Sequence, residues 1–129
     1  MVVKAKLPKL KNRQKRSSKG MKKCLKNCIA CSYVKEVKSV KIFNSEWKIR
    51  APVDCQMSNV VYMIECQKST CNSRYIGETN RSLKDRFLEH KGYIVTKKLN
   101  QATGYHFHKP GHSLNDFKIF IIEKIKKTR

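Results

Sequence analysis

Apolar and polar positions in the second half of the chain predict two strands followed by a helix. Val60–Ile64 is a run of β-branched and apolar residues, long enough for one buried strand. After a polar connection, Arg74–Gly77 predicts a second strand that ends at a glycine. These two strands are expected to pair as a long-looped hairpin. Leu83, Phe87 and Ile94 then recur near helical spacing and predict one apolar helix face.

The signals around this helix complete a small α+β unit. Ser82, with Asp85 three residues later, is typical of a capping box at a helix start. Residues 96–115 show no regular pattern, so we expect an irregular loop there. Phe117–Ile125 is apolar on both faces and predicts a third, buried strand. A unit of about 70 residues has a thin core and commonly needs additional fastening.

The first half of the chain has a different character. Residues 1–23 are rich in Lys and Arg, contain no acidic residue and predict a disordered basic arm, in which Lys11–Arg16 is a candidate nuclear-localisation patch. Residues 24–57 are rich in cysteine and contain a β-like stretch with a turn expected at Asn44–Glu46. We therefore divide the chain into the basic arm, this cysteine-rich segment and a domain over residues 58–129.

Charge points to a polyanionic partner. Lys and Arg total 30 against 9 Asp and Glu, a net charge of +21. DNA is the natural partner, with RNA as an alternative, because each neutralised phosphate releases counterions. The alternative explanations are plain solubility and an organellar or ribosomal-type basic protein. No stretch is apolar enough to predict a membrane span or a secretory signal, so we expect an intracellular protein, nuclear rather than cytoplasmic, that does not act on membranes.

The upstream cysteines have a spacing that suits a metal. Cys24, Cys28 and Cys31 form a C-x3-C-x2-C pattern, and Cys55 is the next cysteine. In a reducing compartment, clustered cysteines more often hold a metal than form disulfides. These four thiols therefore predict a structural zinc site, with free thiols in a flexible linker as the alternative.

A second ligand set connects the expected hairpin to the loop after the helix. Cys66 and Cys71 form C-x4-C, and His106 and His112 form H-x5-H, with His108 as a competing ligand. A zinc ion held by these residues would pin the loop onto the hairpin and stabilise the small core. Four protein ligands leave no open position, so both zinc sites are expected to be structural.

Four further residues form a candidate active site. The two strands carry Tyr62 and Tyr75, and the helix carries Arg86 and His90, which are four residues apart and so share one helix face. A nuclease needs a base for the attacking water, a cation for the developing phosphorane charge and usually a divalent metal.

These motifs resemble the GIY-YIG endonucleases. The matching stretches are Val60-Val61-Tyr62, Tyr75-Ile76-Gly77-Glu78-Thr79 and Arg86-x-x-x-His90. The cysteine pair between the motifs, together with His106-Phe107 and Gly111-His112, resembles the form carried by Penelope-like retroelements. The resemblance covers roughly residues 24–125.

The resemblance implies a three-stranded antiparallel sheet with flanking helices and the nicking of DNA by phosphodiester hydrolysis with Mg²⁺. It implies that Tyr62 is the general base or orients the attacking water, and that Tyr75 hydrogen-bonds the water or the phosphate. Arg86 would clamp the scissile phosphate, His90 would assist proton transfer or positioning, and Gly77 would let the backbone approach the site.

The expected DNA contacts and assembly follow from the same motifs. Basic residues close to the candidate active site are predicted to contact DNA, namely Arg74, Arg81, Lys84 and Lys91. The chain is expected to be a monomer or a part of a longer retroelement polyprotein.

Two departures from the family pattern shape the prediction. Val60 stands where the family usually has glycine, and no helix with a metal-binding glutamate follows the third strand. Glu123, the last acidic residue, falls within that strand. We therefore predict a C-terminally incomplete, retroelement-derived nuclease domain. The alternatives are a catalytically inactive, zinc-stabilised nucleic-acid-binding module and an incomplete product without a stable fold.

Overall fold

The computed structural model describes residues 18–24 and 28–126. The basic arm up to residue 17, with its candidate localisation patch, lies outside the described residues. The end of the predicted arm is ordered: Gly20–Met21 form β1, which pairs in parallel with β4 (Pro52–Val53). Met21 is fully buried in the core, which accounts for the ordering of this short strand.

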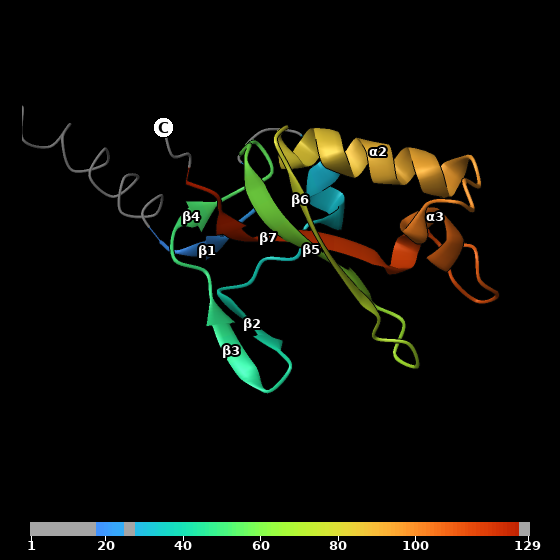
Figure 1. Ribbon diagram of the computed structural model, residues 1–129, viewed down its shortest axis with the longest axis horizontal. Helices are drawn as coiled ribbons and strands as arrows, with labels where there is room; N and C mark the ends of the chain where they lie inside the picture. The colour runs from blue at the N-terminus through green and yellow to red at the C-terminus, as the bar shows by residue number, and fades with distance from the viewer. Residues whose placement is uncertain (1–17, 25–27, 127–129) are drawn as a thin grey trace, which may run out of the picture.

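The centre of the molecule is the expected three-stranded antiparallel sheet. β5 (Val60–Cys66) lies between β6 (Arg74–Thr79) and β7 (Phe117–Lys124) (Figure 1). The apolar runs of β5 and β7 are almost wholly buried, whereas exposed and less exposed residues alternate along the edge strand β6. The long-looped hairpin and the third strand predicted from hydropathy are both confirmed.

Helix α2 (Leu83–Val95) lies along one side of this sheet (Figure 1). Its start is fixed as the sequence predicts, because Ser82 Oγ accepts a hydrogen bond of 3.1 Å from the Asp85 amide. The predicted stripe of Leu83, Phe87 and Ile94 is buried. Phe87 stacks on Tyr33, with ring centroids 5.0 Å apart, so the cysteine-rich segment also packs against the helix.

Part of the loop expected at 96–115 is helical. Residues Ala102–His106 form α3, and η2 (Leu114–Asp116) leads into β7. One turn is too short to produce a periodic sequence pattern, so tertiary packing fixes α3 instead. Gly104 shows how close that packing is, since a Cβ atom there would lie 2.2 Å from the Lys98 carbonyl oxygen.

The cysteine-rich segment contains η1 (Ile29–Tyr33) and a hairpin of β2 (Ser39–Ile42) and β3 (Ser45–Lys48). The hairpin is where the sequence predicts it, but its turn is Phe43–Asn44 rather than Asn44–Glu46. Ser45 and Glu46 pair with β2, which shortens the turn. The hairpin projects away from the sheet and helices (Figure 1), and at its base Trp47 Nε1 donates a 3.0 Å hydrogen bond to the Ile122 carbonyl.

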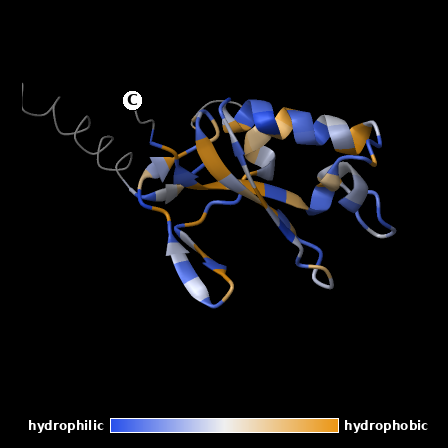
Figure 2. Ribbon diagram, viewed as in Figure 1, coloured by the Kyte–Doolittle hydropathy of each residue, from blue (hydrophilic) through white to orange (hydrophobic). Residues whose placement is uncertain are grey.

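A single apolar core joins these parts, with buried members from Met21 to Ile122. Hydrophobic residues follow β5 and β7, whereas much of the outer side of α2 is polar (Figure 2). Within the described part of the chain, no helix has the length and apolar character required to cross a membrane.

Candidate active site and metal centres

The hydroxyl group of Tyr62 joins three of the four residues predicted for the active site. It accepts a 2.9 Å hydrogen bond from Arg86 Nε and lies 3.0 Å from His90 Nε2. Tyr62 extends from the central strand β5, while Arg86 and His90 lie one turn apart on α2. The i, i+4 spacing therefore places both helix residues on the same phenolic oxygen.

Gly77 makes room for this arrangement. It pairs with Tyr62 across β5 and β6, and a Cβ atom at position 77 would lie 2.7 Å from the Tyr62 hydroxyl oxygen. Real Cβ atoms essentially never approach another atom so closely. The glycine of the second motif thus accommodates the tyrosine of the first.

His90 is held from both sides of its ring. Nδ1 lies 2.8 Å from Thr103 Oγ1 on α3, and the side chain is buried. Burial, followed by the charge of Arg86, lowers the pKa of His90 to about 4, so its imidazole is neutral near pH 7. A neutral ring has one donor and one acceptor. We assign the hydrogen to Nδ1, which donates to Thr103 and leaves Nε2 to accept from Tyr62.

Arg86 is oriented by an acidic neighbour that the sequence motifs did not single out. Its Nη1 hydrogen-bonds Glu89 Oε1, which also forms a 2.6 Å ion pair with Arg81. Burial alone would lower the pKa of Arg86, but the bond to Glu89 raises it, so the guanidinium stays charged. The bond to Arg86 likewise lowers the pKa of Glu89.

Tyr75, the fourth predicted residue, lies beside His106, a member of the second predicted ligand set. Its register places it on the same face of the sheet as Tyr62. Its ring contacts His106 edge to face, with centroids 5.5 Å apart, and burial raises its pKa. Tyr75 therefore lies between the Tyr62 site and the second ligand set, and its role in catalysis stays a prediction.

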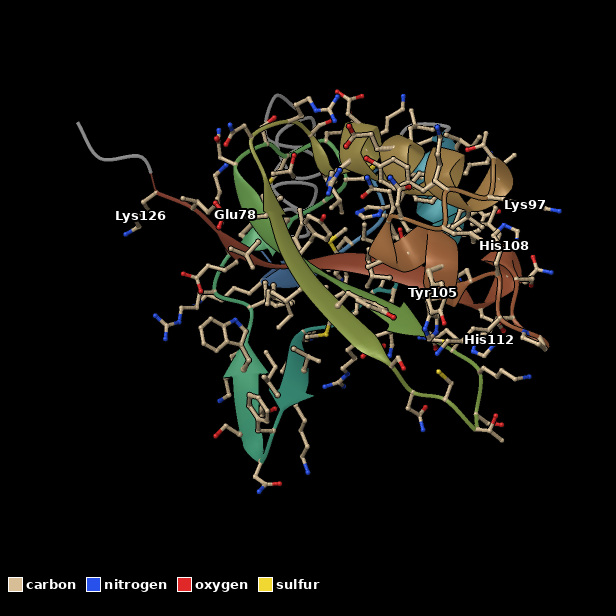
Figure 3. All side chains as sticks on the ribbon, turned by 45° about the vertical axis from the view of Figure 1, so that its right-hand side comes forward. Glu78, Lys97, Tyr105, His108, His112 and Lys126 are labelled. Atoms are coloured by element: carbon tan, nitrogen blue, oxygen red, sulfur yellow. The ribbon has the colours of Figure 1, made fainter. Side chains whose placement is uncertain are left out.

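The two strand carboxylates nearest Tyr62 in the sheet register, Glu78 and Glu123, do not face Tyr62. Glu123 and Glu78 both pair with Val61, the neighbour of Tyr62 that faces the other side of the sheet. Figure 3 shows Glu78 far from the end of the molecule that carries His112. Within residues 18–24 and 28–126, the groups of three or more residues able to hold a metal are two cysteine-containing clusters. Glu123 is thus not placed to bind a metal beside Tyr62.

The first cluster consists of the four upstream cysteines, as their spacing predicts. Their sulfur atoms lie within 4.8 Å of one another. The Cys24 and Cys31 sulfurs are 3.5 Å apart, and the Cys55 sulfur lies 3.4 Å from Cys28 and 3.8 Å from Cys31. Burial raises the pKa of Cys31 to about 11 and also raises that of Cys55. These thiols are gathered in a geometry that could hold a metal ion.

The second cluster consists of Cys66, Cys71, His106 and His112, whose ligand atoms also lie within 4.8 Å of one another. Cys71 Sγ is 3.5 Å from His106 Nε2. A hydrogen bond with Ser73 is the main cause that lowers the pKa of Cys71, to about 6.

The contacts of His112 and His108 show which of these two loop histidines is placed to bind a metal. His112 Nδ1 lies 3.3 Å from the Pro110 carbonyl, and its Nε2 is buried with no hydrogen-bond partner in the described structure. His108 Nε2 instead lies 2.6 Å from the Ile94 carbonyl, which removes it as a competing ligand (Figure 3). A buried nitrogen without a partner at a ligand cluster is an expected feature of a metal site.

The four basic residues predicted to contact DNA differ in their surroundings. Arg74 forms a 3.0 Å ion pair with buried Glu65, and Arg81 pairs with Glu89 as described above. Lys84 and Lys91 are seven residues apart on α2 and so lie on one helix face. DNA binding by these residues stays a prediction.

Comparisons with protein-family models, with curated proteins and with solved structures found no match to this chain.

The site geometry predicts that His90 stays neutral in mild acid. At about pH 5.5 an ordinary histidine, with a pKa of about 6.5, is mostly protonated, whereas His90 with a pKa of about 4 is not. Imidazole NMR resonances followed from neutral pH to about pH 5.5 should show no titration of His90. The His90→Gln variant identifies its signals. A His90 resonance that titrates near pH 6.5 would contradict the buried, hydrogen-bonded arrangement.

Proposed function

We propose that the chain acts on nucleic acid and that Tyr62, Arg86 and His90 form a phosphodiester-cleaving site of the GIY-YIG endonuclease type, with DNA as the substrate. The observation that carries the proposal is the Tyr62 hydroxyl oxygen, which lies between a charged guanidinium and a neutral imidazole. The net charge of +21 supports a polyanionic substrate.

In this proposal, His90 and Arg86 have different tasks at the tyrosine. The neutral His90 Nε2 accepts the hydrogen bond of the phenol, and Thr103 holds the ring in the tautomer that does so. Arg86 Nε lies beside negative charge that develops on the phenolic oxygen. Tyr62 is therefore positioned to orient an attacking water, or to accept its proton while the phenolic proton moves to His90 Nε2, which is the role that the resemblance implies.

Arg86 also has donors left for a phosphate. A guanidinium has five N–H donors, and the contacts to Tyr62 and Glu89 engage Nε and Nη1. Tyr93 takes up a further hydrogen bond of the guanidinium, whose side chain is 27% exposed, so in this proposal a phosphate approaches the donors that are left. A charged, partly buried arginine held in place on both sides is well suited to clamp a phosphate.

We infer that the ion in both clusters is zinc and that its role is structural. Tetrahedral zinc with Zn–S bonds of about 2.3 Å and Zn–N bonds of about 2.0 Å places sulfurs about 3.8 Å apart and a sulfur and nitrogen about 3.5 Å apart. Three of the six sulfur pairs of the first cluster are separated by 3.4, 3.5 and 3.8 Å, and one sulfur–nitrogen pair of the second by 3.5 Å. Each cluster provides four ligands, which leaves no open position for hydrolysis.

A second candidate function is a zinc-stabilised nucleic-acid-binding module that does not cut. It is favoured by the arrangement of the described carboxylates, since Glu123 pairs with Val61 and Glu89 is bound by two arginines. This candidate predicts binding that weakens steeply with salt and has little sequence preference.

Cleavage of a supercoiled plasmid tests the first candidate. In buffer with Mg²⁺, which the resembled family requires, the wild-type chain should convert the plasmid to nicked circles. Tyr62→Phe should lower the rate by about 10²- to 10⁴-fold, the range for a lost acid–base group. Arg86→Ala should lower it by about 10²- to 10³-fold, the range for a lost donor to transition-state charge. Tyr105→Phe, at a side chain that is 58% exposed, is the matched control and should retain the rate.

Nicking that persists in both Tyr62→Phe and Arg86→Ala would assign the cleavage to another agent and exclude this site. Salt-sensitive plasmid binding without nicking would favour the second candidate.

Zinc content tests the second cluster with a matched pair of histidines. Native mass spectrometry after treatment with a chelating resin should find two zinc ions in the wild-type chain, from the two clusters. His112→Gln should reduce this to one, because it removes a ligand, whereas His108→Gln should retain both. Equal zinc loss in the two variants, or a wild-type chain without zinc, would contradict the inferred ligand set.

A further inference from the structure

The tip of the β2–β3 hairpin carries an aromatic side chain that packing does not explain. Phe43 is 96% exposed, the largest exposure among the exposed large hydrophobic residues of the described chain. Because Ile42 pairs with Ser45, Phe43 and Asn44 form a two-residue turn. The ring is thus exposed to solvent, at the end of a hairpin that projects from the rest of the fold (Figure 1).

The backbone at Phe43 is unfavourable for a phenylalanine. Its φ angle is +56°, in the left-handed region that glycine and asparagine adopt most readily. The two-residue turns of hairpins prefer glycine, asparagine or aspartate at positions with positive φ. A bulky side chain there costs stability without gaining burial, which suggests that the ring contacts something outside the folded chain.

The surroundings of the tip identify the kind of partner. Between residues 38 and 50 the chain has four basic side chains and one acidic side chain, Glu46, whose carboxylate is bonded by Ser39 Oγ at 2.8 Å. A groove of about 670 Å³ lies at the hairpin base, and four of its eight lining residues are basic: Lys19, Lys38, Lys48 and Arg50. Trp47 and the acidic Glu46 also line it.

The two faces of the hairpin differ, and the open face is polar. Val40 is buried and Trp47 is fixed to the Ile122 carbonyl on one face. Lys41, Glu46 and Lys48 lie on the other face. A lipid-inserting hairpin would present several apolar side chains at its tip, whereas this tip presents the Phe43 ring alone, and the partly exposed Trp47 lies nearer the base among basic side chains. Phosphates and the π-faces of bases occur together in nucleic acid, and they match this combination.

From these observations we propose that the β2–β3 hairpin is a separate nucleic-acid contact, in which Phe43 stacks against or inserts beside a base and the basic groove binds the adjacent phosphates. The proposal rests on the nucleic-acid partner inferred above, but it is independent of cleavage at Tyr62. The base is either an unpaired nucleotide or a member of an opened base step in a duplex.

The Phe43→Gly substitution distinguishes an effect on DNA binding from an effect on folding. Phe43→Gly removes the ring and supplies the residue that the positive φ favours, so thermal stability should be retained or increased. Affinity of the full chain for fluorescein-labelled DNA should nevertheless fall by about 5- to 150-fold, the effect of losing one aromatic–base stack. Phe43→Tyr should restore most of the affinity. Leu99→Gly, which removes another exposed apolar side chain (58%), should have no effect.

Salt dependence and the choice of probe complete the test. Phe43→Gly should leave the slope of log affinity against log salt unchanged, whereas Lys48→Gln should reduce it by about 1. A perfectly paired duplex and the same duplex with one unpaired nucleotide distinguish the two sources of the base: a larger effect of Phe43→Gly on the second probe indicates an unpaired base.

Equal DNA affinity of Phe43→Gly and the wild-type chain would overturn the hairpin contact and leave the Tyr62 proposal standing. Binding to phosphatidylserine vesicles that requires Phe43, with no effect of Phe43 on DNA binding, would overturn it in favour of a membrane contact. A wild-type chain that binds neither of the two DNA duplexes would overturn both this contact and the proposed function.

Discussion

The gathering of cysteine and histidine side chains at two points is the constraint on which the candidate site depends. Cys55, in the first cluster, accepts a 2.8 Å backbone hydrogen bond from the Lys84 amide in the first turn of α2, the helix that carries Arg86 and His90. His106, in the second cluster, lies three residues after Thr103 on α3, and Thr103 holds His90. The zinc ions that we propose for the two clusters would therefore fix elements that meet at Tyr62, in a domain whose core is small.

The proposed structural role of the second cluster is linked to the proposed chemistry at Tyr62. A hydrogen-bonded phenol between an arginine and a neutral histidine requires sub-ångström placement of two helices against one strand. The apolar contacts of Phe87 with Tyr33 and Phe117 position α2, but α3 is a single turn with little intrinsic stability. A zinc ion in the second cluster, as proposed, would anchor that turn at His106, so the orientation of the His90 ring would depend on ligands that take no part in the proposed chemistry.

The parts of this architecture that the sequence predicts well are those with a repeating or paired signal. The apolar runs of β5 and β7, the stripe on α2 and the ligand spacings all have such signals, and the structure confirms them. Thr103 and Glu89 had no comparable signal, because their partners are distant in sequence or belong to a one-turn helix. The sequence pattern predicts the hairpin turn at the wrong residues, because Phe43 occupies a turn position where glycine and asparagine are usual.

Zinc-edge X-ray absorption of the purified chain tests the central claim most directly. Six cysteine sulfurs and two histidine nitrogens shared between two ions predict an average of three sulfurs and one nitrogen per zinc. The distances should be about 2.3 Å to sulfur and about 2.0 Å to nitrogen. A coordination shell of oxygen and nitrogen without sulfur, or a chain that retains its fold with no zinc bound, would contradict the account in which the two clusters hold the Tyr62 site together.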